Sequence, residues 1–300
     1  MKNAPIAALL LALLALFASE SFGRPAPDST SKQPVEIFQG GILELTIPAA
    51  GLTAVEGRMG KAMIPFLASG NDSYTGLVGA DLEAKPGPVT MVVKATTLSG
   101  ARRDSQIFLR IKAKSFKQES FSVAKEFDQL GPEALERIRQ DQAQFSRAFV
   151  TSAPERLWDG HFISPISSEV SSPFGYRRVV NGIPRAPHTG VDLRAPMGSE
   201  VLATNHGRVV LLGDFFFSGY SVVLDHGAGL YTMYFHLSEF KVEMGSIVRK
   251  GDVIGLSGMS GRVTGPHLHW GARLNGARVD PFELLHNVGH AEGNLGLAPP

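Results

Sequence analysis

Hydrophobic and polar residues alternate along two separate regions of the chain. In the first region, residues 35–116, short alternating runs occur at 42–47, 89–94 and 107–111. A period of two is typical of strands with one buried face, and the residues between the runs are the glycine, proline, asparagine and aspartate that favour turns. The pattern predicts a β-sandwich-like domain of immunoglobulin type over this region.

The period changes to that of a helix in the next segment, residues 117–154. Proline is well suited to the first turn of a helix, and Pro132 stands at the start of the new pattern. The apolar positions at helical spacing are Leu135, Ile138, Phe145 and Phe149. An amphipathic helix of this kind packs on a neighbouring domain more often than it binds a separate partner. We predict a helical linker and assign it no chemistry.

A second set of alternating runs follows in residues 155–288 and predicts another all-β domain. The runs lie at 201–203, 208–212, 220–224, 231–236 and 267–274. Glycines at 258, 261 and 265 make the approach to the last run a sharply shaped loop. Loops of this kind often position chemical groups on a rigid sheet.

The N-terminus predicts an exported protein. Residues 1–23 contain one lysine, then a run dominated by leucine and alanine, then small residues, which is the pattern of a signal peptide. An uncleaved membrane anchor is the alternative, because the run lacks a clear cleavage site. The expected location is periplasmic or extracellular. A flexible tether at 24–34 and a tail at 289–300 complete the predicted organisation.

Composition narrows the classes of function. The sequence has 29 basic and 28 acidic residues and a formal net charge of +1, so it lacks the basic excess of a nucleic-acid-binding protein. It contains no cysteine, which excludes disulfides, a lipid-anchored cysteine and a cysteine nucleophile. A metal ion is the natural substitute for such a nucleophile.

Two histidines near the C-terminus have the spacing of a metal site. His267 and His269 lie two residues apart in an alternating run, so both leave one face of a strand roughly 7 Å apart. One can bind a metal while the other reaches a metal-bound water. Five other histidines have no partner at such spacing and are interpreted as structural or solvated: His161, His206, His226, His286 and His290.

His188 and Asp192 supply the other predicted ligands. Four residues of an extended strand span roughly 13 Å, so these two side chains can share an ion only if the chain turns, which Gly190 permits. A catalytic zinc usually takes three protein ligands and leaves its fourth position to water. His269 is the expected third ligand, and His267 is then free to accept or orient the proton of that water.

His236 is the second candidate for acid–base chemistry. Strict alternation places it on the same face as Tyr234 and opposite the apolar layer of Met233 and Phe235. Its charged form there would stabilise a developing oxyanion or protonate the leaving amine. The alternative is a structural zinc site, closed by His236 or His267 as a fourth ligand.

The order H-x-x-x-D, a later strand histidine and H-x-H resembles that of the lysostaphin-like zinc metallopeptidases, which include many bacterial peptidoglycan endopeptidases. Residues 172–177 and 248–255 are also similar to that family, and the resemblance extends over about 165–284. It implies a C-terminal antiparallel β metallopeptidase domain that holds one zinc ion per chain. The implied roles are zinc binding by His188, Asp192 and His269, and catalysis by the pair His236 and His267.

The implied activity is hydrolysis of peptide bonds in peptidoglycan stem peptides or their cross-links. Some family members place an oxyanion-stabilising tyrosine before the first ligand; none stands there in this chain, and Tyr234 or Arg185 are the candidates to replace it. One alternative is a non-catalytic member that binds the wall or activates a separate cell-envelope amidase. Another is a biotinyl or lipoyl carrier, which residues 242–258 resemble, although Lys250 lacks the expected setting.

Overall fold

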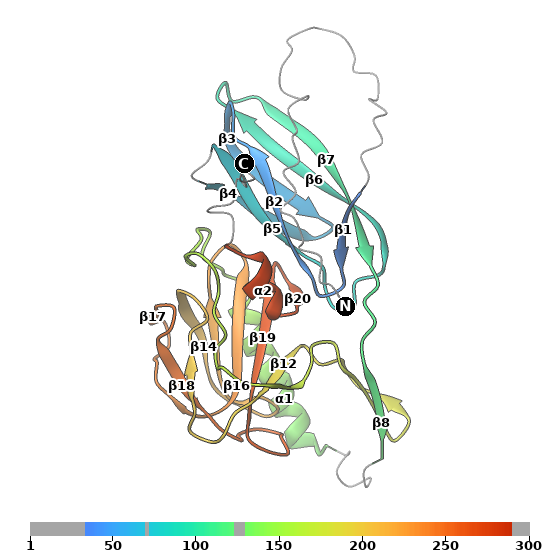
Figure 1. The fold of residues 1–300 in the computed structure, drawn as a ribbon, viewed down its shortest axis with the longest axis vertical. Helices are drawn as coiled ribbons and strands as arrows, with labels where there is room; N and C mark the ends of the chain where they lie inside the picture. The colour runs from blue at the N-terminus through green and yellow to red at the C-terminus, as the bar shows by residue number, and fades with distance from the viewer. Residues whose placement is uncertain (1–33, 70–71, 123–129, 290–300) are drawn as a thin grey trace, which may run out of the picture.

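The computed structural model describes residues 34–69, 72–122 and 130–289, which form two β-rich units (Figure 1). The predicted signal peptide at 1–23, nearly all of the tether at 24–34 and the tail beyond Gly289 lie outside the described residues. Across the described ranges, no helix is long and apolar enough to span a membrane.

The N-terminal unit is one seven-stranded sheet. Its strands are β1 (Val35–Phe38), β2 (Ile42–Pro48), β3 (Leu52–Met59), β4 (Ala62–Ser69), β5 (Ser73–Gly79), β6 (Gly87–Thr97) and β7 (Arg102–Lys112). The order β1-β7-β6-β3-β4-β5-β2 places the first two strands at opposite edges, yet only residues 39–41 connect them, so the edges come together. The β-domain prediction is confirmed, with one curled, barrel-like sheet in place of two facing sheets.

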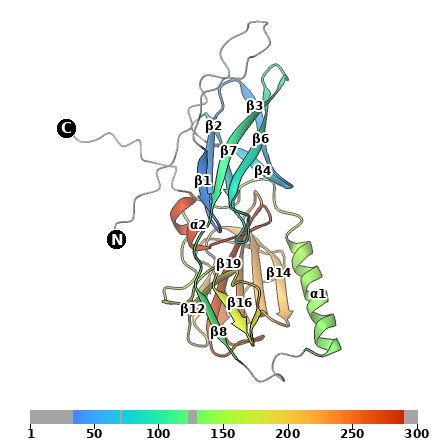
Figure 2. The same ribbon diagram turned by 90° about the vertical axis from the view of Figure 1, so that its right-hand side faces the viewer.

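The segment between the units contains a strand as well as the predicted helix. β8 (Gln118–Phe121) pairs in parallel with β10 (Arg177–Val180), which also pairs with β11 (Ile183–Pro184). Helix α1 (Pro132–Ala148) begins at the predicted proline, but residues 118–121 are extended rather than helical. Figure 2 shows α1 along one side of the C-terminal unit, where it contacts β14 (Gly207–Phe215).

The C-terminal unit is built on an antiparallel sheet whose main path is β17-β14-β15-β16-β19-β12-β9, with β13, β18 and β20 paired beside it. The bounds of these strands are β9 (Val170–Ser172), β12 (Gly190–Arg194), β13 (Glu200–Leu202), β15 (Gly219–Asp225), β16 (Leu230–Phe240), β17 (Ile247–Val248), β18 (Val253–Ser257), β19 (His267–Leu274) and β20 (Ala277–Val279). A short helix, α2 (Phe282–Asn287), follows. The predicted antiparallel β fold is confirmed.

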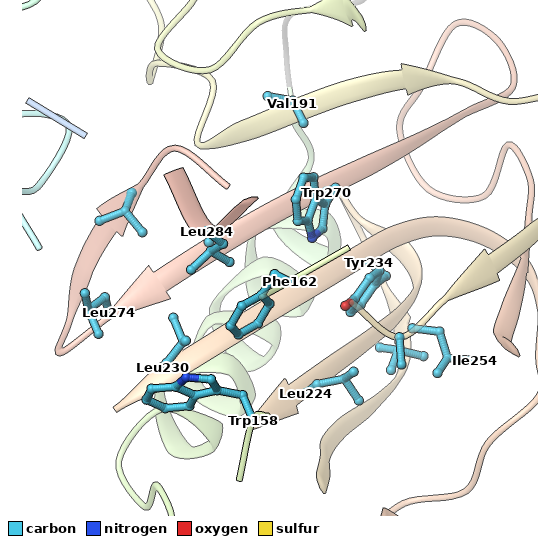
Figure 3. Close-up of a cluster of buried hydrophobic side chains, with 14 of the residues drawn as sticks. Trp158, Phe162, Val191, Leu224, Leu230, Tyr234, Ile254, Trp270, Leu274 and Leu284 are labelled. Carbon is cyan, nitrogen blue, oxygen red and sulfur yellow. The ribbon is translucent and has the colours of Figure 1, made fainter. Parts of the chain in front are cut away.

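The main core lies on one face of this second sheet. Trp270 and Tyr234 are completely buried there, in one cluster with Phe162 and Leu284 (Figure 3). The helix α1 runs behind the strands in that view, on the other face. Because side chains alternate along a strand, the neighbours of Trp270 in β19 point toward the face that α1 covers.

The N-terminal unit packs on one end of the second sheet. Leu82 is completely buried in the core of the C-terminal unit, and Arg278 of β20 pairs with Asp81 at 2.6 Å. Gly79, the last residue of β5, lies against Leu274 at the end of β19. The histidine pair begins that strand, so the N-terminal unit contacts the end of β19 that is far from the histidines.

Candidate metal centre

Three side chains converge on one point over the paired strands β12 and β19. Asp192 and His269 are direct neighbours across this antiparallel pair, and His188 lies in the loop before β12. His188 Nε2 is 3.0 Å from both Asp192 Oδ1 and His269 Nδ1, and His269 Nδ1 is 2.9 Å from Asp192 Oδ1. The three residues predicted to bind zinc thus offer ligand atoms that all lie within 4.8 Å of one another.

Hydrogen bonds with the preceding hairpin hold the His188 loop in place. The Gly175 N–H donates to the His188 carbonyl at 2.8 Å, and the His188 N–H donates to the Tyr176 carbonyl at 2.9 Å. The Tyr176 hydroxyl donates to Glu119 of β8 at 2.9 Å. Gly175 has a φ of +76°, and a Cβ there would collide with the Phe116 ring. The segment leaving the N-terminal unit therefore supports the loop that carries the first ligand.

Gly190 has a different role from the predicted one. It is the first residue of β12 and pairs with Gly271 of β19, so it does not form a turn. A Cβ at this position would lie 2.5 Å from the Trp270 carbonyl oxygen and 2.6 Å from His269 Nε2. Glycine is needed here because the imidazole of His269 packs directly against the backbone of β12. His188 is brought close to Asp192 by the loop before β12, and not by a turn at Gly190.

The charge states of Asp192 and His269 suit a cation. Burial raises the pKa of Asp192, but hydrogen bonds with His188 and His269 outweigh burial and hold that pKa well below its usual range. Burial is also the main cause that lowers the pKa of His269. At neutral pH the site therefore combines an ionised carboxylate with a neutral imidazole.

The donor atoms fit a zinc ion. His188 Nδ1 lies 3.0 Å from the Pro173 carbonyl oxygen and donates to it, so Nε2 is the ring atom turned toward Asp192 and His269. Hydrogen bonds between Asp192 Oδ1 and the two imidazoles hold the three ligand atoms together. A divalent cation would replace the protons of these bonds, and two imidazoles with one carboxylate form a ligand set that catalytic zinc accepts.

Two further imidazoles lie beside the ligands. The ring centroids of His236 and His267 are 4.8 Å apart, and His267 Nε2 is 3.8 Å from Asp192 Oδ1. His236 Nδ1 lies 3.0 Å from the Ser260 carbonyl oxygen, and His267 Nδ1 lies 2.8 Å from that of Gly265. Because these carbonyls accept a proton from Nδ1, each imidazole in its neutral form has an unprotonated Nε2.

His236 is a base rather than a cation in the resting protein. Burial is the largest cause that lowers the pKa of His236 to about 4, and the neighbouring charges of His269 and His267 lower it further. At neutral pH the ring is neutral, so it can donate a proton to a leaving group only after accepting one. The imidazolium predicted from the sequence is therefore not the resting state.

A backbone irregularity brings His236 to the site. Alternation predicted a face shared with Tyr234, but Tyr234 is buried in the main core on the opposite side of the sheet. His236 has a φ of 65°, which is uncommon for residues other than glycine, and the pairing of β15 with β16 changes register at this point. The side chain turns to the face of His269, and their ring centroids are 6.1 Å apart.

The position of Tyr234 also removes it as a candidate for the oxyanion role. Its hydroxyl lies 2.8 Å from the Thr204 hydroxyl and accepts from the Thr232 hydroxyl at 2.9 Å, within the core. Arg185 is exposed in the connection between β11 and β12 and stays a candidate. The role therefore stays unassigned among the described residues.

Comparison with known proteins agrees with this geometry. Residues 186–281, which include all five site residues, match the family model described as Peptidase family M23. The chain carries an M23 peptidase domain. The predicted lysostaphin-like resemblance is thereby confirmed. A crystal structure assigned to peptidase M23 from Pseudomonas aeruginosa is 28% identical with a TM-score of 0.66, and the match covers 85% of this chain and 96% of that one.

The M23 domain also matches part of longer curated proteins. DD-carboxypeptidase/endopeptidase Mpg of Neisseria meningitidis serogroup B is 43% identical over 126 residues, which are 42% of this chain and 29% of that protein. Peptidoglycan DD-endopeptidase ShyA of Vibrio cholerae is 41% identical over 122 residues, which are 40% of this chain and 28% of that protein. The match thus spans less than a third of each relative.

Histidines predicted to lie outside the site do so where the structure describes them. His226 is completely buried, with Nδ1 2.7 Å from the His206 carbonyl oxygen and Nε2 2.7 Å from the Thr232 hydroxyl. His286 Nδ1 lies 2.7 Å from the Phe282 carbonyl oxygen of α2. His290 lies outside the described residues. None of the described ones belongs to the group of three metal-binding candidates.

Lys250 does not have the setting of a carrier lysine. Its ammonium group donates to the carbonyl oxygens of Asp159 at 2.6 Å and His161 at 2.9 Å. A carrier lysine must instead project from a hairpin tip to receive its cofactor. The contacts of Lys250 hold the segment at Asp159 and His161 against the β17–β18 connection.

His226 makes the M23 domain sensitive to acid. Burial lowers the pKa of His226 to about 4, whereas an unfolded histidine titrates at 6.5. Below pH 6.5 the unfolded chain binds a proton that the folded chain does not, so stability falls as pH drops from 6.5 toward 4, by on the order of 3 kcal/mol. Urea unfolding of wild type and His226→Gln at pH 7.0, 5.5 and 4.5 should show a smaller acid-dependent loss in the variant. Equal losses would contradict this assignment.

The sequence interpretation missed the aromatic support of the site. The ring of Phe235 stacks on His269 with a centroid distance of 5.2 Å and an interplanar angle of 5°. Phe145 of α1 packs edge-on against Phe235 at 5.6 Å. The helical spacing of apolar residues in α1 predicted that Phe145 packs on a neighbouring domain. Only the fold shows that this neighbour is the face of the sheet bearing the metal ligands.

Proposed function

We propose that this protein is a zinc-dependent endopeptidase that hydrolyses peptide bonds in peptidoglycan stem peptides or their cross-links. The observation that carries the proposal is the arrangement around Asp192, where three ligand atoms converge and two further imidazoles, each with Nδ1 on a carbonyl oxygen, stand beside them. A structural zinc site is closed by four protein ligands and does not require two further imidazoles beside them.

Each residue of the site has a distinct chemical task in this proposal. His188, Asp192 and His269 would hold the zinc, which when bound lowers the pKa of a water to about 7 and polarises the scissile carbonyl. His267 Nε2 lies 3.8 Å from the ligand atom Asp192 Oδ1, and His267 would accept the first proton of the attacking water. His236 would accept the second proton of that water, and both protons would pass to the leaving amine as it becomes an ammonium.

Peptidoglycan is proposed as the substrate on two grounds. The Vibrio cholerae relative is named a peptidoglycan DD-endopeptidase, and the Neisseria relative a DD-carboxypeptidase/endopeptidase. Residues 1–23 have the pattern of an export signal, which would place the protein in the periplasm or outside the cell, where the wall lies. We propose a cell-envelope location on the second ground.

Mass spectrometry of purified peptidoglycan tests the proposal. The zinc-loaded mature chain should convert cross-linked fragments into shorter ones and identify the bond by the mass change. His267→Ala should bind one zinc per chain and produce none of these fragments. His286→Ala, which changes an exposed histidine of the same unit, is the matched control and should cut like the wild type.

Zinc binding without cleavage of any peptidoglycan would contradict the endopeptidase proposal. It would favour the non-catalytic alternative, in which the protein binds the wall or activates a separate amidase. Cleavage that persists in His267→Ala would instead contradict the role given to that imidazole.

A further inference from the structure

A surface pocket lies beside the metal centre on the same face of the sheet. Alternation along β19 places His267, His269, Gly271 and Arg273 on this face, opposite the core residues of the strand. The pocket has a volume of about 460 Å³. It is lined by Gln142, Phe145, Ser146, Phe149, Phe217, Ser218, Met233, Phe235 and Arg273. The helix α1 therefore forms one wall, and β16 and β19 form the floor.

Phe235 connects the pocket to the metal centre. One face of its ring stacks on His269, and the same side chain lines the pocket. Arg273 lies four residues beyond His269 in β19, which is roughly 13 Å along the strand. An extended peptide covers that distance in about four residues. A peptide whose scissile bond lies at the metal centre can therefore reach Arg273.

Arg273 is the only cationic side chain that lines this pocket, and no carboxylate of the described residues forms an ion pair with it. Asp81, which is paired with Arg278, attracts Arg273 only from a longer distance. Its side chain is half-buried, and its buried Nε atom has no hydrogen-bond partner in the described part of the chain. The guanidinium carbon lies 4.6 Å from the ring centroid of Phe149, which holds the group in place on its apolar side. The adjacent Arg278 is already paired with Asp81 and Glu83.

A partly buried guanidinium without a carboxylate is costly unless a ligand supplies one. Burial is the main cause that lowers the pKa of Arg273, the nearby charge of Arg278 lowers it further, and the charge of Asp81 offsets only part of both effects. The group stays charged because arginine does not deprotonate at physiological pH. Guanidinium groups bind carboxylates through two parallel hydrogen bonds, and a partly desolvated pocket strengthens them.

We infer that this pocket binds a carboxylate of the peptide substrate through Arg273, with Phe149 and Phe235 packing on the apolar part of that peptide. The inference rests on the proposed endopeptidase function, because it treats the pocket as an extension of the cleavage site. It assigns the protein a preference for peptides that carry a free carboxylate about four residues from the cleaved bond. Either a side-chain or a C-terminal carboxylate has the required chemistry.

Binding of acidic peptides in four forms tests the inference without turnover. Each peptide has one side-chain carboxylate and one C-terminal carboxylate. In the four forms both are free, only the side-chain group is amidated, only the terminal group is amidated, or both are amidated. The full chain carrying His267→Ala is used so that peptide is not consumed, and calorimetry gives each affinity. The free peptide should bind about tenfold or more tightly than the doubly amidated one. The singly amidated forms identify which carboxylate is bound.

Arg273→Met in the same background should remove this difference while binding of the doubly amidated peptide stays unchanged. Methionine keeps apolar contact with Phe149, so loss of packing is limited. Arg273→Lys should restore part of the preference, because it restores the charge without the bidentate geometry. Arg208→Met, which removes an exposed arginine of β14 outside the pocket, is the matched control and should bind all four peptides like the parent chain.

Two outcomes would overturn the inference. One is equal binding of all four peptides, or no binding of any. The other is a loss in Arg273→Met that is the same for the free and the doubly amidated peptides, since that result indicates only a structural role. The proposed function is tested in a separate measurement, the cleavage of peptidoglycan by the chain that retains His267. The proposed function and the Arg273 pocket can therefore fail independently.

Discussion

His269→Ala should lose zinc and peptidase activity together. The substitution removes one of three converging ligand atoms and leaves Asp192 with a single histidine at 3.0 Å. Zinc affinity should fall by more than the roughly 10–100-fold that follows loss of an outer-shell partner, because a ligand itself is removed. Cleavage should drop below about 1% of wild type, since the polarising ion is gone.

Zinc content after dialysis against a weak chelator, measured with cleavage of peptidoglycan on the same samples, checks this expectation. Circular dichroism should show the wild-type β signal, because only a side chain on the site face of β19 is shortened. His286→Ala should keep full zinc content and full activity. A His269→Ala protein that retained one zinc per chain would show that the ion is held elsewhere.

Substitution of His236 should have the opposite effect on metal, with zinc retained and turnover lost. His236→Asn is the sharpest variant, because asparagine tolerates the positive φ at this position and can still donate to the Ser260 carbonyl. It lacks the Nε2 base. The turnover rate should fall by about 100- to 10,000-fold, which is the range of acid–base catalysis by one side chain.

Steady-state cleavage of a soluble peptide and zinc quantification on the same preparation test this division of roles. His236→Ala should be at least as inactive, and its stability should also fall because alanine is strained at a φ of 65°. Equal loss of zinc from the His236 and His269 variants would mean that His236 is a ligand. The site would then approach the closed, structural type.

The N-terminal unit packs away from the histidines, but the segment that leaves it supports the metal centre. Its β5 strand contacts β19 and β20 at the end of β19 distant from the histidines, and the Arg278–Asp81 pair holds the two units together there. The segment leaving that unit then runs past the His188 loop through Phe116 and Glu119. The N-terminal region thus supports the loop of the first ligand from the side.

Much of the site could be predicted from sequence because part of its geometry is local. His267 and His269 share a face in any strand, since side chains alternate with a period of two. The choice of metal is also limited by local information, because imidazole and carboxylate groups are ligands that zinc binds. The strands of both units follow from the same alternation, as β6 and β19 show. None of these conclusions requires knowledge of which strands pair.

The sequence by itself therefore determined the all-β character of both units, the helix beginning at Pro132 and the set of residues able to form the site. Tertiary structure decided the rest. The positive φ of His236 reverses its face, and strand pairing sets Asp192 opposite His269. Packing of α1 places the Arg273 pocket beside the metal centre. These features depend on contacts between distant segments, and a local pattern carries no information about such contacts.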